Sequence, residues 1–150
     1  MRLQKDLREF VELLISHRVD FVVVGGHAVA FHGHPRYTGD IDFLVRPTQE
    51  NAVRLLEVLA VFGFGDAGIT VEELMLPERV IQLGVPPNRV DLLTSISGVQ
   101  IEDAFASRVN SQLDGLPVFF LGREVLLRNK LAAGRTKDLA DIQELNNRGE

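Results

Sequence analysis

The spacing of apolar residues divides the chain into alternating helical and extended segments. Near the N-terminus, Leu7, Phe10 and Leu14 recur at helical spacing, whereas residues 21–24 form a β-branched run typical of a buried strand. We therefore predict a helix at 3–17 and a strand at 20–24. The same two patterns predict further helices at 26–32, 48–61, 101–107, 123–133 and 136–146, and strands at 40–45, 80–83, 89–93 and 117–121.

These elements predict an α+β fold with a mixed β-sheet and helices packed mainly on one face. Thr48 is expected to cap the helix 48–61, and Gly134 to separate the last two helices. A length of 150 residues with 45% hydrophobic content suits a single domain over 1–150. Its parts are the N-terminal helix 3–17, a sheet region at 20–121 and a C-terminal helical segment at 123–147.

Two aspartates lie on one face of the strand 40–45. The strand period of two directs Asp40 and Asp42 to one side and Ile41 and Phe43 to the other. Strand rise places their side-chain origins about 6.7 Å apart. At that separation the charges repel by about 2.5 kcal/mol at an effective dielectric near 20. A cation is therefore expected between them, either a metal such as Mg²⁺ or an arginine, for which Arg36 and Arg89 are candidates.

A third carboxylate, Asp91, lies in the strand 89–93 between apolar residues. A buried acidic residue of this kind must be paired, exposed or bound to a cation. Arg89 shares its strand face by the i, i+2 rule, so an ion pair along the strand is the alternative to a metal ligand.

Gly25 and Gly26 follow the first strand and precede a short helix. Glycine adopts backbone angles closed to other residues, and N–H groups at a helix start face anions, so this turn can bind phosphate. An ordinary strand-to-helix turn is the alternative. His27 comes next, and its predicted role is either a hydrogen bond to phosphate or a structural position at the helix start. A zinc site is not expected, because the chain has no cysteine and the histidines lack ligand spacing.

Four motifs resemble a known family. They are Gly25-Gly26-His27-Ala28, Arg36-x-Thr38-x-Asp40-Ile41-Asp42, the run 84–94 that contains Arg89 and Asp91, and Asn129-Lys130-x-Ala132-x-x-Arg135-x-Lys137-Asp138-x-x-Asp141. Together they resemble the nucleotidyltransferase superfamily that includes DNA polymerase beta. More closely, they are similar to the small AbiEii-type, toxin-like nucleotidyltransferases. The resemblance covers residues 20–145.

The resemblance implies the roles of several residues. Asp40, Asp42 and Asp91 would hold the catalytic metal, Mg²⁺ or Mn²⁺, and Asp91 would also accept the proton of the attacking hydroxyl. Gly25 and Gly26 would hold the nucleoside triphosphate. Lys130 would lie near the triphosphate, followed by the acidic Asp138. Of the basic residues, Arg36, Arg89, Lys130 and Arg135 are candidates to balance its charge. For Lys130 and Arg135, a solvated position on a charged helix is the alternative.

Charge and composition restrict the partners. A formal net charge of −5 argues against a broad nucleic-acid surface, but basic residues gathered in the last quarter leave room for an RNA end such as a tRNA acceptor. No apolar stretch reaches the roughly 20 residues of a membrane span, so no membrane partner is expected. The absence of cysteine fits a cytoplasmic location.

The predicted function is metal-dependent transfer of a nucleoside monophosphate from a nucleoside triphosphate to a hydroxyl acceptor. RNA, a protein and a small molecule are open as acceptors, and so is membership of a toxin–antitoxin system with a partner protein. The alternative is a weakly active or non-catalytic antitoxin or interaction module with the same fold. An acceptor pocket of the antibiotic-modifying type is expected to find little room in so short a chain.

Overall fold

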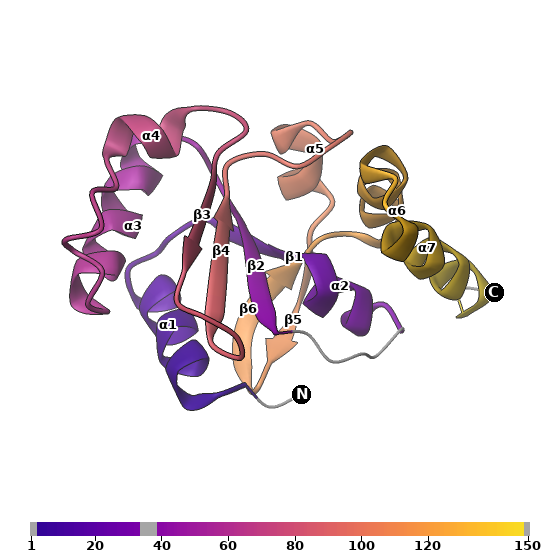
Figure 1. Cartoon of the computed structure of the whole chain (residues 1–150), viewed down its shortest axis with the longest axis horizontal. Helices are drawn as coiled ribbons and strands as arrows, with labels where there is room; N and C mark the ends of the chain where they lie inside the picture. Colours follow the sequence, from indigo (N-terminus) through magenta and orange to yellow (C-terminus); the bar gives the residue numbers. More distant parts are fainter. Residues whose placement is uncertain (1–2, 34–38, 149–150) are drawn as a thin grey trace.

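The computed structural model describes residues 3–33 and 39–148, which form a mixed sheet flanked by helices (Figure 1). Its strands are β1 (Phe21–Val24), β2 (Asp40–Val45), β3 (Val80–Leu83), β4 (Arg89–Leu93), β5 (Val109–Leu113) and β6 (Leu116–Phe120). They are ordered β3-β4-β2-β1-β6-β5. The pairs β2–β4 and β1–β6 are parallel, and the other three pairs are antiparallel. The predicted α+β fold with a mixed sheet is confirmed.

The helices are α1 (Lys5–Ser16), α2 (Gly25–Phe31), α3 (Gln49–Val61), α4 (Val71–Met75), α5 (Ile101–Ala106), α6 (Arg123–Ala133) and α7 (Thr136–Arg148). The Phe10 ring of α1 packs 6.0 Å from the Phe43 ring of β2 and 5.2 Å from that of Phe62, which follows α3. Since strand side chains alternate, Asp40 and Asp42 point to the sheet face opposite α1. Among the described helices, none is long and apolar enough to cross a membrane.

Local signals in the sequence set several boundaries. The Thr48 side chain accepts a hydrogen bond from the backbone N–H of Asn51 and so caps α3, as predicted. Gly134 adopts φ 65° and ends α6, which allows α7 to turn back along it. The strand 40–45 and the helix 123–133 have the predicted limits, and β3 and β4 form the predicted antiparallel hairpin.

Other boundaries differ from the predictions. The helix expected at 3–17 extends over Lys5–Ser16, and the strand expected at 117–121 lies one residue earlier. Two elements were not predicted, α4 and β5. The helix α4 has five residues, too few to show helical periodicity, and β5 is an edge strand whose exposed positions carry polar side chains.

Candidate active site

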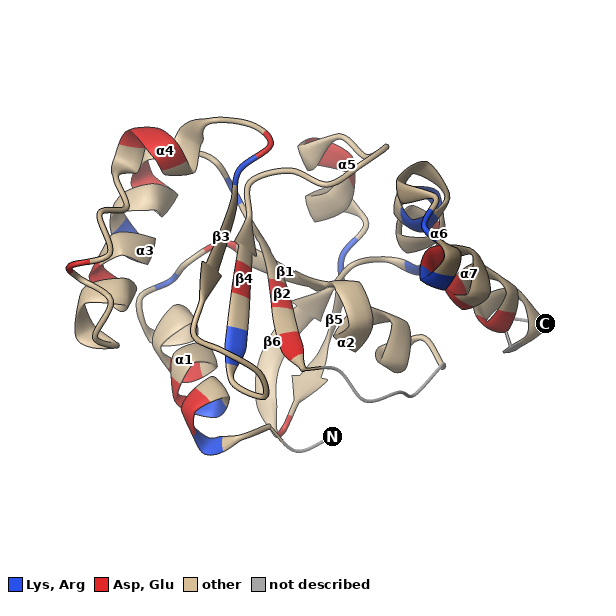
Figure 2. Cartoon of the chain, in the orientation of Figure 1, with Lys and Arg blue, Asp and Glu red and all other residues tan. Residues whose placement is uncertain are grey.

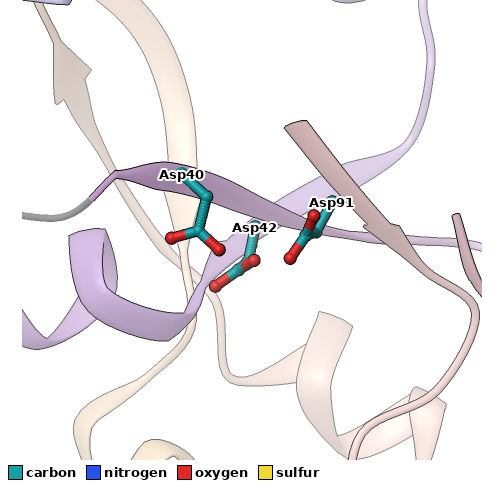
Figure 3. Close-up of side chains that lie close together, drawn as sticks. All are labelled: Asp40, Asp42 and Asp91. Atoms are coloured by element: carbon teal, nitrogen blue, oxygen red, sulfur yellow. The ribbon is translucent and has the colours of Figure 1, made fainter. Parts of the chain in front are cut away.

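Asp40, Asp42 and Asp91 come together on adjacent strands. Because β2 and β4 are parallel with Asp42 opposite Asp91, their side chains leave the same sheet face as neighbours. Figure 3 shows the three carboxylates converging from the two strands. One oxygen of each lies within 4.8 Å of the others. We call this group the carboxylate cluster.

Arg89 lies against the carboxylate cluster and makes ion pairs with two of its members. Its register position is opposite Asp40, and it shares a strand face with Asp91. Arg89 Nη2 donates to Asp40 Oδ2 at 2.6 Å and to Asp91 Oδ2 at 3.2 Å. Arg89 Nε lies 3.2 Å from Asp91 Oδ1. The sequence left open whether a metal or an arginine neutralises these aspartates, and the structure shows that Arg89 forms ion pairs with two of them.

Among the described residues, the ion pairs of Arg89 reach Asp40 and Asp91 of the carboxylate cluster. Burial raises the pKa of Asp42 to about 7, helped by repulsion from Asp40 and by the neighbouring Asp91. Burial also raises the pKa of Asp91. Near neutral pH the cluster therefore retains a proton that a stronger cation would displace.

The cluster fits a hard divalent cation. Its donors are carboxylate oxygens, the ligand type that Mg²⁺ and Mn²⁺ prefer. The Asp91 side chain is only 9% exposed, and its buried Oδ1 lies near Arg89 Nε in a geometry that makes no hydrogen bond. This oxygen therefore has an ion pair with Arg89 and no hydrogen bond. Three converging acidic groups and a buried oxygen of this kind are what a metal site requires.

Gly25 makes room for the Asp42 side chain. Its φ of +64° lies in the left-handed region, and a Cβ on Gly25 would collide with Asp42 Oδ2. Gly25 and Gly26 both line a cavity of about 990 Å³ together with the three aspartates. The predicted turn thus lies beside the carboxylates, at the start of α2.

The cavity joins strands and C-terminal helices. On one side are residues of β3, β4 and the segment after β4, and on the other side are residues of α6, the α6–α7 turn and the start of α7. They are Glu78, Val80, Gln82, Arg89, Leu93 and Ser95–Gly98 on the first side, and Asn129, Lys130, Ala133, Arg135 and Lys137 on the second. Figure 2 shows acidic positions on β2 and β4 and basic positions on α6 and α7.

Lys130 belongs to a second charged group. Its Nζ lies 3.1 Å from Asp138 Oδ1 and 3.3 Å from Asp141 Oδ2, and all three side chains are at most 4% exposed. Arg135 Nε donates to Asp138 Oδ2 at 2.6 Å from a largely exposed position. We call these four residues the lysine cluster. The alternative of a solvated Lys130 is therefore wrong, because two carboxylates of α7 enclose its ammonium group.

Asp138 has a structural place in the lysine cluster. It also accepts a hydrogen bond from the backbone N–H of Arg135, which satisfies a donor at the start of α7. Burial alone would raise the pKa of Asp138, but the bonds from Arg135 and Lys130 outweigh it and lower this pKa to about 2. Asp138 does not line the cavity formed by the described residues. Any influence of Asp138 on nucleotide binding would therefore depend on Lys130 and Arg135, which it holds in place.

His27 and Arg36 were the other residues predicted to contact the nucleotide. His27 is buried in α2, and burial lowers its pKa, so the ring is neutral near pH 7. His27 does not line the cavity formed by the described residues. This favours a structural position at the start of α2 over a hydrogen bond to phosphate. Arg36 lies outside the described residues.

Several cavity residues were missed from the sequence. Gln82 lies opposite Asp91 in the β3–β4 register, and counting across the predicted hairpin would have found it. Val80 lies opposite Leu93 on the same face. The partnership of Asp141 with Lys130 had no comparable signal, because it depends on how α7 packs against α6.

Solved structures share this fold. The lincosamide antibiotic adenylyltransferase LnuA, solved with lincomycin, is 17% identical, with a TM-score of 0.60 over 96% of each chain. ANT(2″)-Ia in complex with adenylyl-2″-tobramycin is 14% identical, with a TM-score of 0.60 over 96% of this chain and 87% of that one. An antigenic nucleotidyltransferase-like protein from Paracoccidioides brasiliensis is 20% identical, with a TM-score of 0.57 over 97% of this chain and 76% of that one. Such identities show a common fold only.

Sequence comparison gives the family. No curated protein matches the chain significantly. A family model described as nucleotidyltransferase of unknown function (DUF6036) matches residues 2–148. The match includes the strands of the carboxylate cluster and the helices of the lysine cluster. The chain therefore belongs to the DUF6036 family of nucleotidyltransferases and is an enzyme.

Proposed function

We propose that the protein transfers a nucleoside monophosphate from a nucleoside triphosphate to a hydroxyl acceptor with the help of Mg²⁺ or Mn²⁺. The observation that carries the proposal is the carboxylate cluster, which opens into a cavity bordered by the Gly25–Gly26 turn. An ion pair alone would not require three acids at one position. The arrangement suits a reaction in which phosphate charge must be neutralised.

Asp40, Asp42 and Asp91 are the proposed metal ligands. When bound, the divalent ion neutralises charge on the phosphoryl group and on the leaving pyrophosphate. Asp91 also accepts the proton of the attacking hydroxyl in this proposal. Its pKa is raised by burial, which makes it a better base than an exposed aspartate.

The triphosphate is proposed to lie between the glycine turn and α6–α7. Gly25 and Gly26 allow close approach of the backbone, and Arg135 presents an exposed cation at the cavity wall. Lys130 lines the same wall while held by Asp138 and Asp141, so we propose that it acts from a fixed position. Arg36 stays a prediction for the same role.

The cavity adds an observation in favour of a small-molecule acceptor. A volume of about 990 Å³ is at the upper end of the range typical of small-molecule sites, roughly 300–1,000 Å³. Because the nucleotide would occupy part of this volume, room for a small-molecule acceptor stays a proposal. One protein of this fold is named a lincosamide antibiotic adenylyltransferase, and another was solved in complex with adenylyl-2″-tobramycin. An RNA or protein acceptor, a kinship with AbiEii-type toxins and a toxin–antitoxin partner stay predictions, as does the alternative of a non-catalytic antitoxin.

The proposal is tested by incubating the protein with Mg²⁺ or Mn²⁺, each labelled nucleoside triphosphate, and separate pools of RNA, protein and hydroxylated small molecules. We expect metal-dependent movement of label into one pool. Asp42→Asn is the control, because it removes a ligand charge and keeps the side-chain volume. Label transfer that is equal in this variant, or equal with a chelator, would contradict the proposed site.

A further inference from the structure

Arg89 contacts two of the three carboxylates that would bind a metal ion. Its nearest contacts are Asp40 Oδ2 at 2.6 Å and both oxygens of Asp91 at 3.2 Å. Those two residues, with Asp42, supply the oxygens that converge within 4.8 Å. The guanidinium and a metal ion would therefore compete for one set of carboxylates, those of Asp40 and Asp91.

The two cations cannot share that set without repulsion. A Mg²⁺ ion lies about 2.0–2.1 Å from its ligand oxygens. A guanidinium nitrogen held 2.6 Å from Asp40 Oδ2 would lie next to an ion bound by the same carboxylate. Since the ion carries twice the charge and matches carboxylate oxygens better, the arginine is the cation that moves.

Arg89 is placed so that it can move while its backbone stays fixed. Its strand β4 pairs with β2 on one side and β3 on the other. Its side chain is 32% exposed and lines the cavity. A change of side-chain rotamer is enough to turn the guanidinium away from Asp40 and into the cavity.

We propose that Arg89 is an internal stand-in for the metal, which neutralises the carboxylate cluster in the metal-free protein and is expelled by the divalent ion. This inference rests on the metal site of the proposed function. Once expelled, the guanidinium becomes a cation in the cavity and can bind a phosphate of the nucleotide. Metal binding then precedes the contact between Arg89 and the nucleotide.

The first test compares Mn²⁺ affinities by calorimetry in the wild type and in Arg89→Gln. Removing the competitor should tighten Mn²⁺ binding by about fivefold or more, because no fraction of the site is then blocked. Lys137→Gln is the matched control, since Lys137 is an exposed cation on the same cavity wall and removes the same charge. We expect its effect on Mn²⁺ affinity to stay below about twofold.

The outcomes separate this inference from the proposed function. Unchanged or weaker Mn²⁺ binding in Arg89→Gln, or an equal gain in Lys137→Gln, would overturn the stand-in role while leaving the metal site in place. Mn²⁺ binding by Arg89→Gln but not by the wild type would support it strongly. Absence of binding in both proteins would refute the metal site and the inference together.

A second measurement needs no substitution. The side-chain Nε–H signal of Arg89, followed by NMR in the wild type, should shift and exchange faster with water when Mg²⁺ is added. Arg46 provides the reference signal. Its Nε donates to Asp20 Oδ2 at 3.1 Å, and Arg46 does not line the cavity formed by the described residues. An Arg89 signal that stays as unchanged as that of Arg46 while Mg²⁺ binds would overturn the inference.

Discussion

The carboxylate cluster and the lysine cluster border the same cavity and differ in charge balance. In the first, three aspartates are paired with one arginine among the described residues. In the second, Asp138 and Asp141 face Lys130 and Arg135, so acids and bases are equal in number. The unbalanced cluster has a carboxylate whose pKa is raised to about 7, and the balanced cluster has one whose pKa is lowered to about 2. The carboxylate cluster can therefore take up a cation, whereas the lysine cluster holds α6 and α7 together.

The largest expected effect comes from breaking the balanced cluster. Lys130→Met should destabilise the protein by about 3–5 kcal/mol, because it leaves buried carboxylates without their buried partner. Urea unfolding followed by circular dichroism measures the loss. Lys137→Met, at an exposed position, should cost less than about 0.5 kcal/mol. Similar losses in the two variants would contradict a structural role for the lysine cluster.

The next effect concerns the glycine that accommodates the unbalanced cluster. Gly25→Ala should cost about 1–2 kcal/mol from its positive φ and a further loss from the collision with Asp42. Gly68→Ala isolates the first contribution, since Gly68 has φ +76° and nothing within 4 Å of an added Cβ. Thermal unfolding and Mn²⁺ titration of both variants give the comparison. Equal stability losses with intact Mn²⁺ binding would show that Asp42 does not need this space.

The pH dependence of stability distinguishes the clusters without breaking either. The Asp42 pKa of about 7 lies above its unfolded value, so the folded protein binds more protons between pH 4 and 7. Metal-free wild type should therefore lose stability as the pH rises through this window, by at most about 1.4 kcal/mol per pH unit. Asp42→Asn should lose less, and saturating Mn²⁺ should reverse the trend. A wild-type profile that rises over pH 5–7 without metal would contradict the raised pKa.

The smallest effect is expected on Mn²⁺ affinity below neutral pH. A ligand carboxylate must be deprotonated, so affinity should fall by up to about tenfold per pH unit below 7. Calorimetry at pH 6 and pH 7.5 measures this change. An affinity that is constant over this interval would indicate that Asp42 is already ionised in the metal-free protein.

Much of the carboxylate cluster could be predicted from the sequence, because residues close together in the sequence determine which strand face each side chain occupies. Alternation fixed the strand 40–45 and the common face of Asp40 and Asp42, and the i, i+2 rule placed Arg89 beside Asp91. The sequence left open whether a metal or an arginine neutralises them. The structure adds that Arg89 contacts both strands, which required the parallel register of β2 and β4.

The four residues of the lysine cluster lie in one motif of the sequence, but their pairing could not be predicted, because they come from α6, the α6–α7 turn and α7. The sequence left a solvated position open for Lys130, because its burial depends on the turn at Gly134 and on the packing of α7 against α6. Asp138 and Asp141 look like ordinary surface charges in a polar helix. Propensity and spacing do not reveal which charges of such a helix face its neighbour.

The position of Arg89 along the chain has a consequence for biosynthesis. Asp40, Asp42, Asp91 and Arg89 all come from one stretch of 52 residues, and α6 begins only at Arg123. A growing polypeptide completes β2 and β4 before the C-terminal cations have been made. Because Arg89 is part of β4, pairing of this strand with β2 brings the neutralising charge with it. The pairing of β2 with β4 thus supplies a charge partner for the acidic half of the site without the cations of α6 and α7.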